Sequence, residues 1–275
     1  MTQGHWQIEG NAAELYQRYL VPAITTKWAI DLVTRAQPRP GEAVLDVACG
    51  TGVVARAAAK MMVQGRVTGL DLNPGMLEVA RTVPSEGAPI VWIGGSALNL
   101  PFTVDSFDLV LCQLGLQFFP DRERALSEMH RVLLHPGRMA LSVYSGIERT
   151  PGADAFVRAL DRVLGPHSSK IKRGEHSFHN PGQLRNLLTQ ARFVAVEVQT
   201  VTQQIEFPSV LDYVRFQLTA TPMALLLNER VESDRQAAIA QVATETARLS
   251  TAATLQNGMF SFPQEAYVAT ARKHL

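Results

Sequence analysis

Two aspartates and a glycine-rich turn are the residues of this chain whose types and spacing could do chemistry. The turn Gly50-Thr51-Gly52 follows an apolar run and opens an alanine-rich helical pattern, so that Gly50, Gly52 and Ala55 satisfy G-x-G-x-x-G/A. A turn of this kind lets the backbone approach a nucleotide-like ligand closely, although glycine turns also close ordinary loops. The residues around the turn must therefore show whether it binds a nucleotide-like ligand or closes an ordinary loop.

The two aspartates select among nucleotide-like ligands. Asp71 ends a second apolar run, about 20 residues beyond the glycines, where a carboxylate can accept both ribose hydroxyls of an adenosine. Asp46 stands beside the turn, and its negative charge opposes a pyrophosphate but favours an ammonium or a sulfonium. S-adenosylmethionine combines an adenosine with both of these cations.

Alternating periodicities indicate the elements that must position these residues. Helical patterns cover residues 12–36, 51–63, 75–82 and 122–134, and strand-like runs cover residues 43–47, 66–70, 90–93, 107–112 and 138–144. This alternation predicts a doubly wound α/β fold. Further along we expect helices over residues 152–165 and 182–191 with a polar loop between them, strands over 194–201 and 266–272, and a largely helical stretch over 206–257.

Composition limits the classes of partner. The 275 residues are 46% apolar and carry a formal net charge of +1, with basic residues scattered apart from residues 170–173. We therefore expect a small-molecule acceptor and no nucleic acid. No run of about 18 apolar residues and no targeting pattern is present, which predicts a cytoplasmic protein without a membrane span. Cys49 and Cys112 are too few for a metal cluster, so no metal is expected, and we interpret them as small buried side chains.

Six segments carry a family pattern in a fixed order. They are residues 45–52, 69–77, 95–102, 106–113, 115–119 and 128–133. Together they resemble the class I S-adenosylmethionine-dependent methyltransferases, and more narrowly the bacterial ubiquinone/menaquinone-methyltransferase-like branch. The resemblance implies a Rossmann-like, seven-stranded, mostly parallel sheet with helices on both faces and a helical lid inserted around the late strands. It also implies that the first and fourth strands are neighbours and that the late strands form an antiparallel edge.

The resemblance implies a set of cofactor contacts. The expected set is Tyr19, Asp46, Ala48, Gly50, Thr51, Gly52, Asp71, Leu72, Met76, Ser96, Ala97 and Gln113. Ala48 stands where the family often has glycine, which is tolerable if the local backbone is not left-handed. Ser96 stands where the family usually has aspartate. A neutral hydroxyl should bind the adenine amino group more weakly than a carboxylate does, so we expect somewhat weaker cofactor binding.

Acceptor selection is expected outside the nucleotide-binding core. The predicted organisation is N-terminal cap helices over residues 1–40, a core over 41–145, a lid segment over 146–180, a core continuation over 181–204, a helical acceptor segment over 205–262 and a final core strand over 263–275. The candidates for positioning the acceptor are Tyr16, Gln117, Phe178 and Tyr213. Tyr16 and Tyr19 are predicted to share one helical face. The apolar lid residues equally suit a lid that packs on itself or a homodimer face.

Little catalytic machinery is expected, because a sulfonium-borne methyl group is already electrophilic and mainly needs alignment. His176 and His179 are the candidates for a general base, with two surface histidines as the alternative. The leading hypothesis is a methyltransferase acting on a small apolar or aromatic metabolite, with O- or C-methylation preferred over N-methylation. A non-methylating protein of the same fold and a nicotinamide-dinucleotide oxidoreductase are the alternatives.

Overall fold

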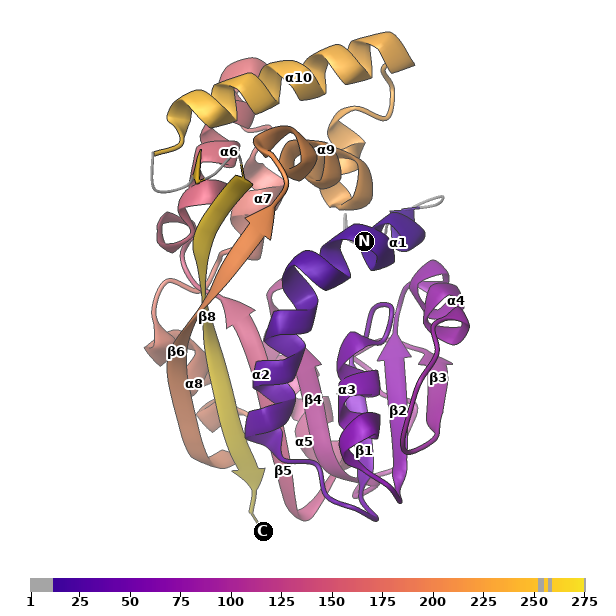
Figure 1. Cartoon of the computed structure of the whole chain (residues 1–275). Coiled ribbons are helices and arrows are strands. Elements are labelled where there is room, and N and C mark those ends of the chain that lie inside the picture. Colours follow the sequence, from indigo (N-terminus) through magenta and orange to yellow (C-terminus); the bar gives the residue numbers. More distant parts are fainter. Residues whose placement is uncertain (1–11, 252–254, 257–258, 275) are drawn as a thin grey trace.

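The computed structural model describes residues 12–251, 255–256 and 259–274. One sheet runs through the core and continues into a helical lid (Figure 1). Its order is β3 (Ile90–Gly94), β2 (Arg66–Asp71), β1 (Ala43–Val47), β4 (Phe107–Gln113), β5 (Leu133–Tyr144), β8 (Met259–Lys273) and β6 (Phe193–Phe207), and β7 (Leu255–Gln256) pairs with β8. The first five strands are parallel to one another, whereas β8 runs antiparallel to both of its neighbours, β5 and β6. The predicted α/β fold and the adjacency of β1 and β4 are confirmed.

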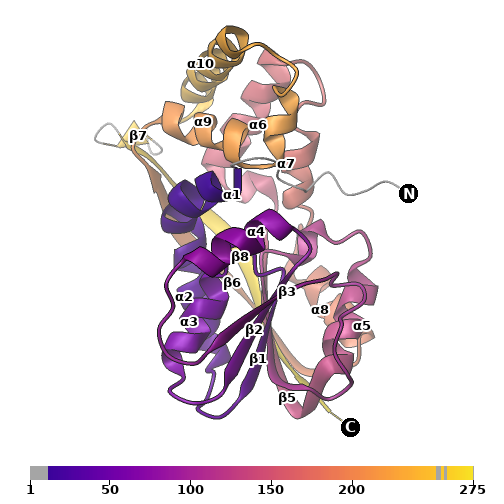
Figure 2. The same cartoon turned by 90° about the vertical axis from the view of Figure 1, so that its right-hand side faces the viewer.

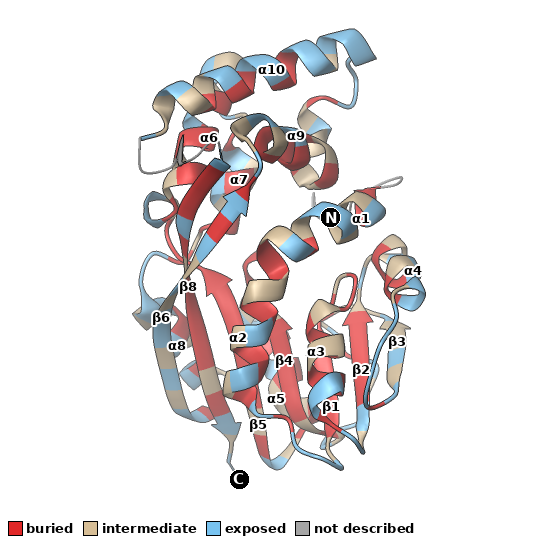
Figure 3. Ribbon diagram, in the orientation of Figure 1, coloured by how far each residue is buried: buried red, intermediate tan, exposed pale blue. Residues whose placement is uncertain are grey.

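Helices cover both faces of this sheet. Figure 2 shows α2 (Thr26–Ala36) and α3 (Val53–Met61) on one face, and α5 (Arg122–Val132) and α8 (Pro181–Gln190) on the other. A separate apolar cluster lies under each pair, one containing Leu32 and Ala55 and the other Leu126 and Leu188. All residues of β1 are buried, as the colours of Figure 3 show. This double burial explains the continuous apolar run in the sequence.

The predicted N-terminal helix contains a change of helix type. It consists of α1 (Ala12–Leu15), a π-helical stretch η1 (Tyr16–Thr25) that includes Pro22, and α2. In a π-helix the hydrogen bonds run over five residues instead of four, which changes the angle between successive side chains. Tyr16 is therefore half-buried while Tyr19 is exposed, so the prediction of one shared face is wrong. The first eleven residues of the predicted cap lie outside the described part.

The lid is built on the far ends of two long strands. Both β6 and β8 extend beyond the sheet, and α6 (Pro151–Val163), α9 (Val210–Ala220) and α10 (Glu232–Leu249) pack there (Figure 1). Tyr213 lies among the rings of Phe156, Phe207, Phe260 and Phe262, with centroid distances of 5.1–5.6 Å. These aromatic residues form a core for the lid itself.

The remaining helical elements are short. Within the core, α4 (Pro74–Thr82) lies between β2 and β3, and η2 (Leu116–Phe118) lies between β4 and α5. The others are η3 (Ile147–Arg149) between β5 and α6, α7 (Lys170–Glu175) between α6 and α8, and η4 (Pro222–Leu226) between α9 and α10. The helix α7 interrupts the stretch that was predicted as a polar loop. Within the described residues, none of the helices has the length and apolar character needed to cross a membrane. Cys49 and Cys112 are free and buried, as interpreted from the sequence.

Candidate cofactor and acceptor site

The glycine turn lies at the carboxyl end of β1, between β2 and β4, where the chain order of the sheet reverses. Gly50 has a φ of +54°, and a side chain there would meet only open space. Gly52 has a φ of +87°, and a Cβ atom there would lie 2.2 Å from the Trp92 ring. The two glycines therefore differ in role. Gly50 leaves room for a ligand, whereas Gly52 makes room for Trp92. Thr51 is buried, and its Oγ1 has no partner among the described residues.

Asp46 is fully buried beside this turn. Its Oδ2 accepts a hydrogen bond of 3.0 Å from the backbone N–H of Ala55, while its Oδ1 has no partner within the described part of the chain. Burial raises the pKa of Asp46 to about 8, the Ala55 bond lowers it, and nearby Asp71 raises it further. A buried acceptor without a partner is costly, and a ligand that carries positive charge or a donor would satisfy it.

Asp71 connects the end of β2 to the turn. Its Oδ2 accepts from the N–H of Gly50 at 2.7 Å, and its Oδ1 accepts from the N–H of Asn73 at 2.8 Å. Burial raises the pKa of Asp71 and these backbone bonds lower it. Each carboxylate oxygen retains a further lone pair for a ligand hydroxyl. Leu72 next to it is 62% exposed, while Met76 in the first turn of α4 is buried.

Ala48 has left-handed backbone, the conformation in which an alanine is not well tolerated in place of glycine. Its φ is +58°, which is left-handed backbone. A non-glycine residue in this region costs about 1–3 kcal/mol, which explains why the family often has glycine at this place. The condition under which alanine was judged tolerable is not met, so Ala48 adds strain to the turn.

We predict that Ala48→Gly raises the free energy of unfolding by about 1 kcal/mol, since relief of left-handed strain exceeds the entropy that glycine adds to the unfolded chain. Ala57→Gly, within the right-handed helix α3, is the matched control and should lower it by about 1 kcal/mol. Urea unfolding of both variants measures the two changes. Changes of the same sign would contradict the assignment of strain.

The loop after β3 approaches the same edge of the sheet. Ser96 Oγ accepts from the N–H of Leu98 at 3.2 Å, and Ser96 forms a β-bridge with Asn99. Ala97 is buried. The Ser96 hydroxyl therefore holds its own turn and keeps its proton and one lone pair for other partners. A contact between Ser96 and the adenine remains a prediction.

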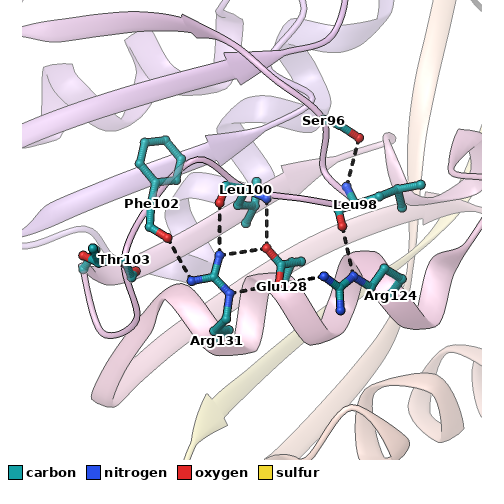
Figure 4. Close-up of polar contacts among 9 residues, drawn as sticks. Ser96, Leu98, Leu100, Phe102, Thr103, Arg124, Glu128 and Arg131 are labelled. Atoms are coloured by element: carbon teal, nitrogen blue, oxygen red, sulfur yellow. Dashed lines mark hydrogen bonds and ion pairs between the residues drawn. The ribbon is translucent and has the colours of Figure 1, made fainter.

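Helix α5 clamps this loop through Arg131, Glu128 and Arg124, and Arg124 donates from Nε to the carbonyl of Leu98 at 3.0 Å (Figure 4). Arg131 donates from Nη1 to the carbonyl of Phe102 at 2.8 Å and from Nη2 to the carbonyl of Leu100 at 3.0 Å. Glu128 accepts from Arg131 Nη2 at 2.7 Å and from the Leu100 N–H at 2.9 Å. The sequence includes both residues in a family motif but gives no signal of this role. Their side chains satisfy three backbone groups of a loop that has little regular structure of its own.

The N-terminal segment spans the site, because α1 contacts both α4, which follows β2, and α9 of the lid. Burial, together with the charges of Asp71, Glu175 and Asp46, raises the pKa of Tyr16 in this segment. Tyr19, which was expected to contact the cofactor, is 46% exposed.

Gln113 binds the N-terminal segment at Thr25, the last residue of η1. Its Nε2 donates to the carbonyl of Thr25 at 3.1 Å, and its Oε1 is buried without a partner among the described residues. Thr25 therefore joins the end of β4 to the closing segment. The sequence analysis did not select Thr25, because helix periodicity does not distinguish a threonine that faces a neighbouring strand.

The two candidate histidines are separated by the structure. His176 is buried and follows the end of α7, while His179 is exposed. Nδ1 of His176 lies 2.8 Å from the carbonyl of Ser145, and its ring stacks on Tyr144 with a centroid distance of 5.0 Å. Burial and Lys172 lower the pKa of His176 to about 3. The surface interpretation is therefore wrong for His176, and its low basicity argues against a general-base role.

The other acceptor candidates occupy different surroundings. Gln117 is buried in η2, and neither its Oε1 nor its Nε2 has a partner in the described residues. Phe178 is buried beneath the guanidinium of Arg122 at 4.6 Å from the ring centroid. The ring of Tyr213 belongs to the lid core, and burial and Glu175 raise its pKa. Gln117 is thus the candidate with free hydrogen-bonding capacity.

Comparisons with known proteins agree with this geometry. The methyltransferase domain family matches residues 45–141. A demethylmenaquinone methyltransferase of Lysinibacillus sphaericus is 34% identical over 145 residues, which are 52% of this chain and 62% of the relative. The relative of the same name from Geobacillus kaustophilus is 32% identical over 190 residues, covering 64% of this chain and 81% of the relative.

The chain belongs to the class I S-adenosylmethionine-dependent methyltransferases, in their menaquinone-methyltransferase-like branch. The crystal structure of a putative methyltransferase from Bacillus halodurans has the same fold, with a TM-score of 0.58, 23% identity, and coverage of 90% of this chain and 99% of that one. The chain spans less than two thirds of the length of the first relative, the one from Lysinibacillus. The nicotinamide alternative has no support in this family.

The residues of the site fit S-adenosylmethionine, the cofactor of this family. The open space at Gly50 and the unpartnered Oδ1 of Asp46 suit a close ligand that carries positive charge. Asp71 would hold the ribose, and the loop that begins at Ser96 would border the adenine.

The raised pKa of Asp46 predicts a pH-dependent stability. The folded chain holds a proton on Asp46 near pH 7 that the unfolded chain releases, so the free energy of unfolding should fall as the pH rises from about 4 to 8. Asp71, which also has a raised pKa, contributes in the same direction, and Arg56 opposes the shift of Asp46. Denaturant unfolding at pH 5, 6, 7 and 8 measures the slope, and Asp46→Asn should flatten it.

Cofactor affinity should have the opposite pH dependence. A cationic cofactor favours the ionised carboxylate, so S-adenosylmethionine should bind more tightly as the pH rises toward about 8. Calorimetric titration in buffers of different ionisation enthalpy would detect release of the proton near pH 7. An unchanged pH dependence in Asp46→Asn would contradict the assignment to Asp46.

Proposed function

We propose that this protein transfers a methyl group from S-adenosylmethionine to an oxygen or carbon of a small apolar or aromatic metabolite, such as a quinone-like ring. The observation that carries the proposal is the placement of the N-terminal segment, because α1 contacts both α4, which follows β2 at the cofactor edge, and α9 of the lid. The cofactor edge of the sheet and the lid therefore meet at this segment.

The chain's own residues suit alignment. When bound, S-adenosylmethionine supplies an electrophilic methyl group on its sulfonium. Gln113 presents a buried amide oxygen that does not titrate and can orient a reactant without exchanging a proton. The lid helices lie beyond the carboxyl end of the parallel strands (Figure 1) and would exclude water from this region. Alignment and exclusion of water are what a direct methyl transfer requires.

The proposed aromatic acceptor is supported by the buried aromatic and apolar side chains between the sheet and the lid. Burial raises the pKa of Tyr144, whose ring stacks on His176, and the large residues of the lid are apolar or aromatic. The relatives from Lysinibacillus and Geobacillus are named demethylmenaquinone methyltransferases. Together these observations favour an aromatic acceptor, with N-methylation as a less favoured possibility.

The first test is titration of the pure protein with S-adenosylmethionine and S-adenosylhomocysteine. Binding of both is expected, and no binding at millimolar concentration would overturn the proposal. The second test incubates the protein with methyl-labelled S-adenosylmethionine and naphthols, quinols or aromatic amines. Labelled product together with S-adenosylhomocysteine supports methyl transfer. Tight cofactor binding without turnover across the whole set would instead support the non-methylating alternative.

A further inference from the structure

The indole of Trp92 lies against two glycines that come from different elements. A Cβ atom at Gly52, in the glycine turn, would lie 2.7 Å from Cζ3 of this ring, and one at Gly69, in β2, would lie 2.5 Å from Cε3. Carbon atoms that are not bonded to each other stay about 3.5 Å or more apart, so the ring occupies the space that a side chain would need at either place. Gly52 belongs to the expected cofactor set, whereas nothing in the sequence singles out Trp92.

Strand pairing puts Trp92 on the same face of the sheet as Asp46. In the parallel register Trp92 of β3 pairs with Gly69 of β2, and Gly69 pairs with Asp46 of β1. Paired residues of neighbouring strands point to the same face, so these three residues form one row across the sheet. Because Gly69 contributes no side chain to this row, the indole reaches over it from the edge strand to the glycine turn.

One consequence of this arrangement is structural. The strand β3 is at the edge of the sheet (Figure 1), and an aromatic ring that covers a glycine of the neighbouring strand stabilises such an edge. Contact with Gly69 alone would serve this purpose. The far edge of the indole also reaches Gly52, which lies outside the sheet. This second contact joins an edge strand to the turn that receives the cofactor.

Gly52 is the residue through which the ring can act on the turn. Its N–H donates to the carbonyl of Cys49 at 2.8 Å, and its carbonyl accepts from the N–H of Arg56 at 3.0 Å. Gly52 therefore belongs both to the glycine turn and to the start of α3, for which it is the N-cap. A displacement of Gly52 would also move the backbone of Gly50 and Thr51, which precede it in the same hydrogen-bonded turn.

The second side chain near Gly52 is that of Arg56. Its Nη1 would lie 2.9 Å from a Cβ atom at Gly52, and this nitrogen is buried without a hydrogen-bond partner among the described residues. An arginine side chain has many rotamers, whereas an indole is a rigid plane with only two side-chain torsions. Of these two neighbours, the indole is therefore the one that defines the position of Gly52.

We propose that Trp92 is a positioning residue for the cofactor. Its indole holds Gly52, and through Gly52 the glycine turn and the first turn of α3, in the conformation that receives S-adenosylmethionine. Trp92 thus acts through the backbone of the turn and needs no contact of its own with the cofactor. The inference rests on the cofactor half of the proposed function and adds a residue that no motif of the sequence contains.

A double-mutant cycle on cofactor affinity tests this role. Gly69 lies in an extended strand, so Gly69→Ala adds a methyl group without left-handed strain, and that group would push the indole away from Gly52. Trp92→Ala and Gly69→Ala should each weaken binding of S-adenosylhomocysteine about tenfold. The double variant should also lose only about tenfold, because the methyl group has no ring to displace once Trp92 is absent.

Additive effects in this cycle would overturn the inference. A methyl group at Gly69 would also lie 3.1 Å from Sγ of Cys49, and this contact is the same with and without the indole. An effect through Cys49 would therefore add to that of Trp92→Ala and give about a hundredfold loss in the double variant. An unchanged affinity in Trp92→Ala would overturn the inference as well.

Trp92→Phe separates the two contacts of the ring. A phenyl ring covers Gly69 but lacks the far edge of the indole, which is the part that reaches Gly52. This variant should therefore resist urea better than Trp92→Ala, yet bind S-adenosylhomocysteine at least about threefold more weakly than the wild-type protein. It also keeps the test decisive if Trp92→Ala does not fold. Wild-type affinity in Trp92→Phe would contradict the proposed role.

Ile90→Ala is the matched control. Ile90 lies two residues before Trp92 in β3, on the same face, pairs with Val67 and packs against the same apolar cluster. It is farther from the carboxyl end of the strand, where the glycine turn lies. Its loss should lower the free energy of unfolding and leave cofactor affinity, measured well below the melting temperature, unchanged. An equal loss of affinity would show that Trp92 acts only through the stability of the edge strand.

The outcomes separate this inference from the proposed function. A wild-type protein that does not bind S-adenosylhomocysteine would contradict the proposed function itself. A wild-type protein that binds it and transfers methyl groups, with additive effects of Trp92→Ala and Gly69→Ala, would contradict only the role of Trp92. In active variants the inference predicts a rise in KM for S-adenosylmethionine that exceeds the fall in kcat.

Discussion

Replacement of Asp71 with alanine should weaken binding of S-adenosylmethionine and S-adenosylhomocysteine by about tenfold to a hundredfold, the range expected when hydrogen bonds to a charged acceptor are lost. The carboxylate does two things at once. It is placed to accept the ribose hydroxyls, and it already holds the N–H groups of Gly50 and Asn73. Without it the turn loses its tie to β2, so both the contact and the shape of the site are affected.

Asp108→Ala is the matched control for this prediction. Asp108 Oδ2 accepts from the N–H of Ala43 at 2.8 Å, which is the same kind of bond between two strands but at the opposite end of the sheet. Both variants should unfold more easily, and only Asp71→Ala should lose cofactor affinity. Isothermal titration with S-adenosylhomocysteine measures this difference. Equal affinity losses in the two variants would show that Asp71 acts only through stability.

Glu128→Gln should lower the free energy of unfolding by about 3 kcal/mol, because it leaves the guanidinium of Arg131 and one backbone N–H short of a charged acceptor. The Glu128 side chain is 5% exposed, so water cannot replace the lost charge. The loop from Ser96 to Phe102 should loosen, and affinity for S-adenosylhomocysteine should fall about tenfold. Urea unfolding and titration well below the melting temperature measure the two effects.

Glu42→Gln provides the comparison for Glu128. Glu42 and Arg138 form a partly buried ion pair, with an Nη1–Oε1 distance of 2.8 Å, that lies at the start of β1, away from the glycine turn. Its loss should also destabilise the fold but should leave cofactor affinity unchanged. If Glu128→Gln behaves in the same way, the clamp on the loop has no part in cofactor binding.

The core could be predicted from the sequence because its signals are local. Residues 43–47 were predicted as a strand with the same bounds that the structure has, since a strand buried on both faces leaves a continuous apolar run. The glycine turn and Asp71 stand where such a strand ends, so their proximity follows from the parallel order of the sheet.

The lid and its contacts could not be predicted in the same way. Strands β6 and β8 were expected to be shorter, because their outer halves are buried only by helices from distant parts of the sequence. Helix α7 was expected to be a loop, because its packing partners, η2 and η4, come from distant parts of the sequence. Local propensity carries no information about such long-range burial.

The alternation of helical and strand-like runs indicated the fold class, and the glycine turn, Asp46 and Asp71 together with the family motifs indicated the cofactor, because all of these signals are local in the sequence. Tertiary structure alone decided how each group behaves. It gave Gly50 and Gly52 different roles, placed Ala48 in a left-handed conformation and buried Tyr16 more deeply than Tyr19. Conformation, burial and hydrogen-bond partners depend on residues far apart in the chain, and these are the quantities that decide conformational strain, protonation and recognition.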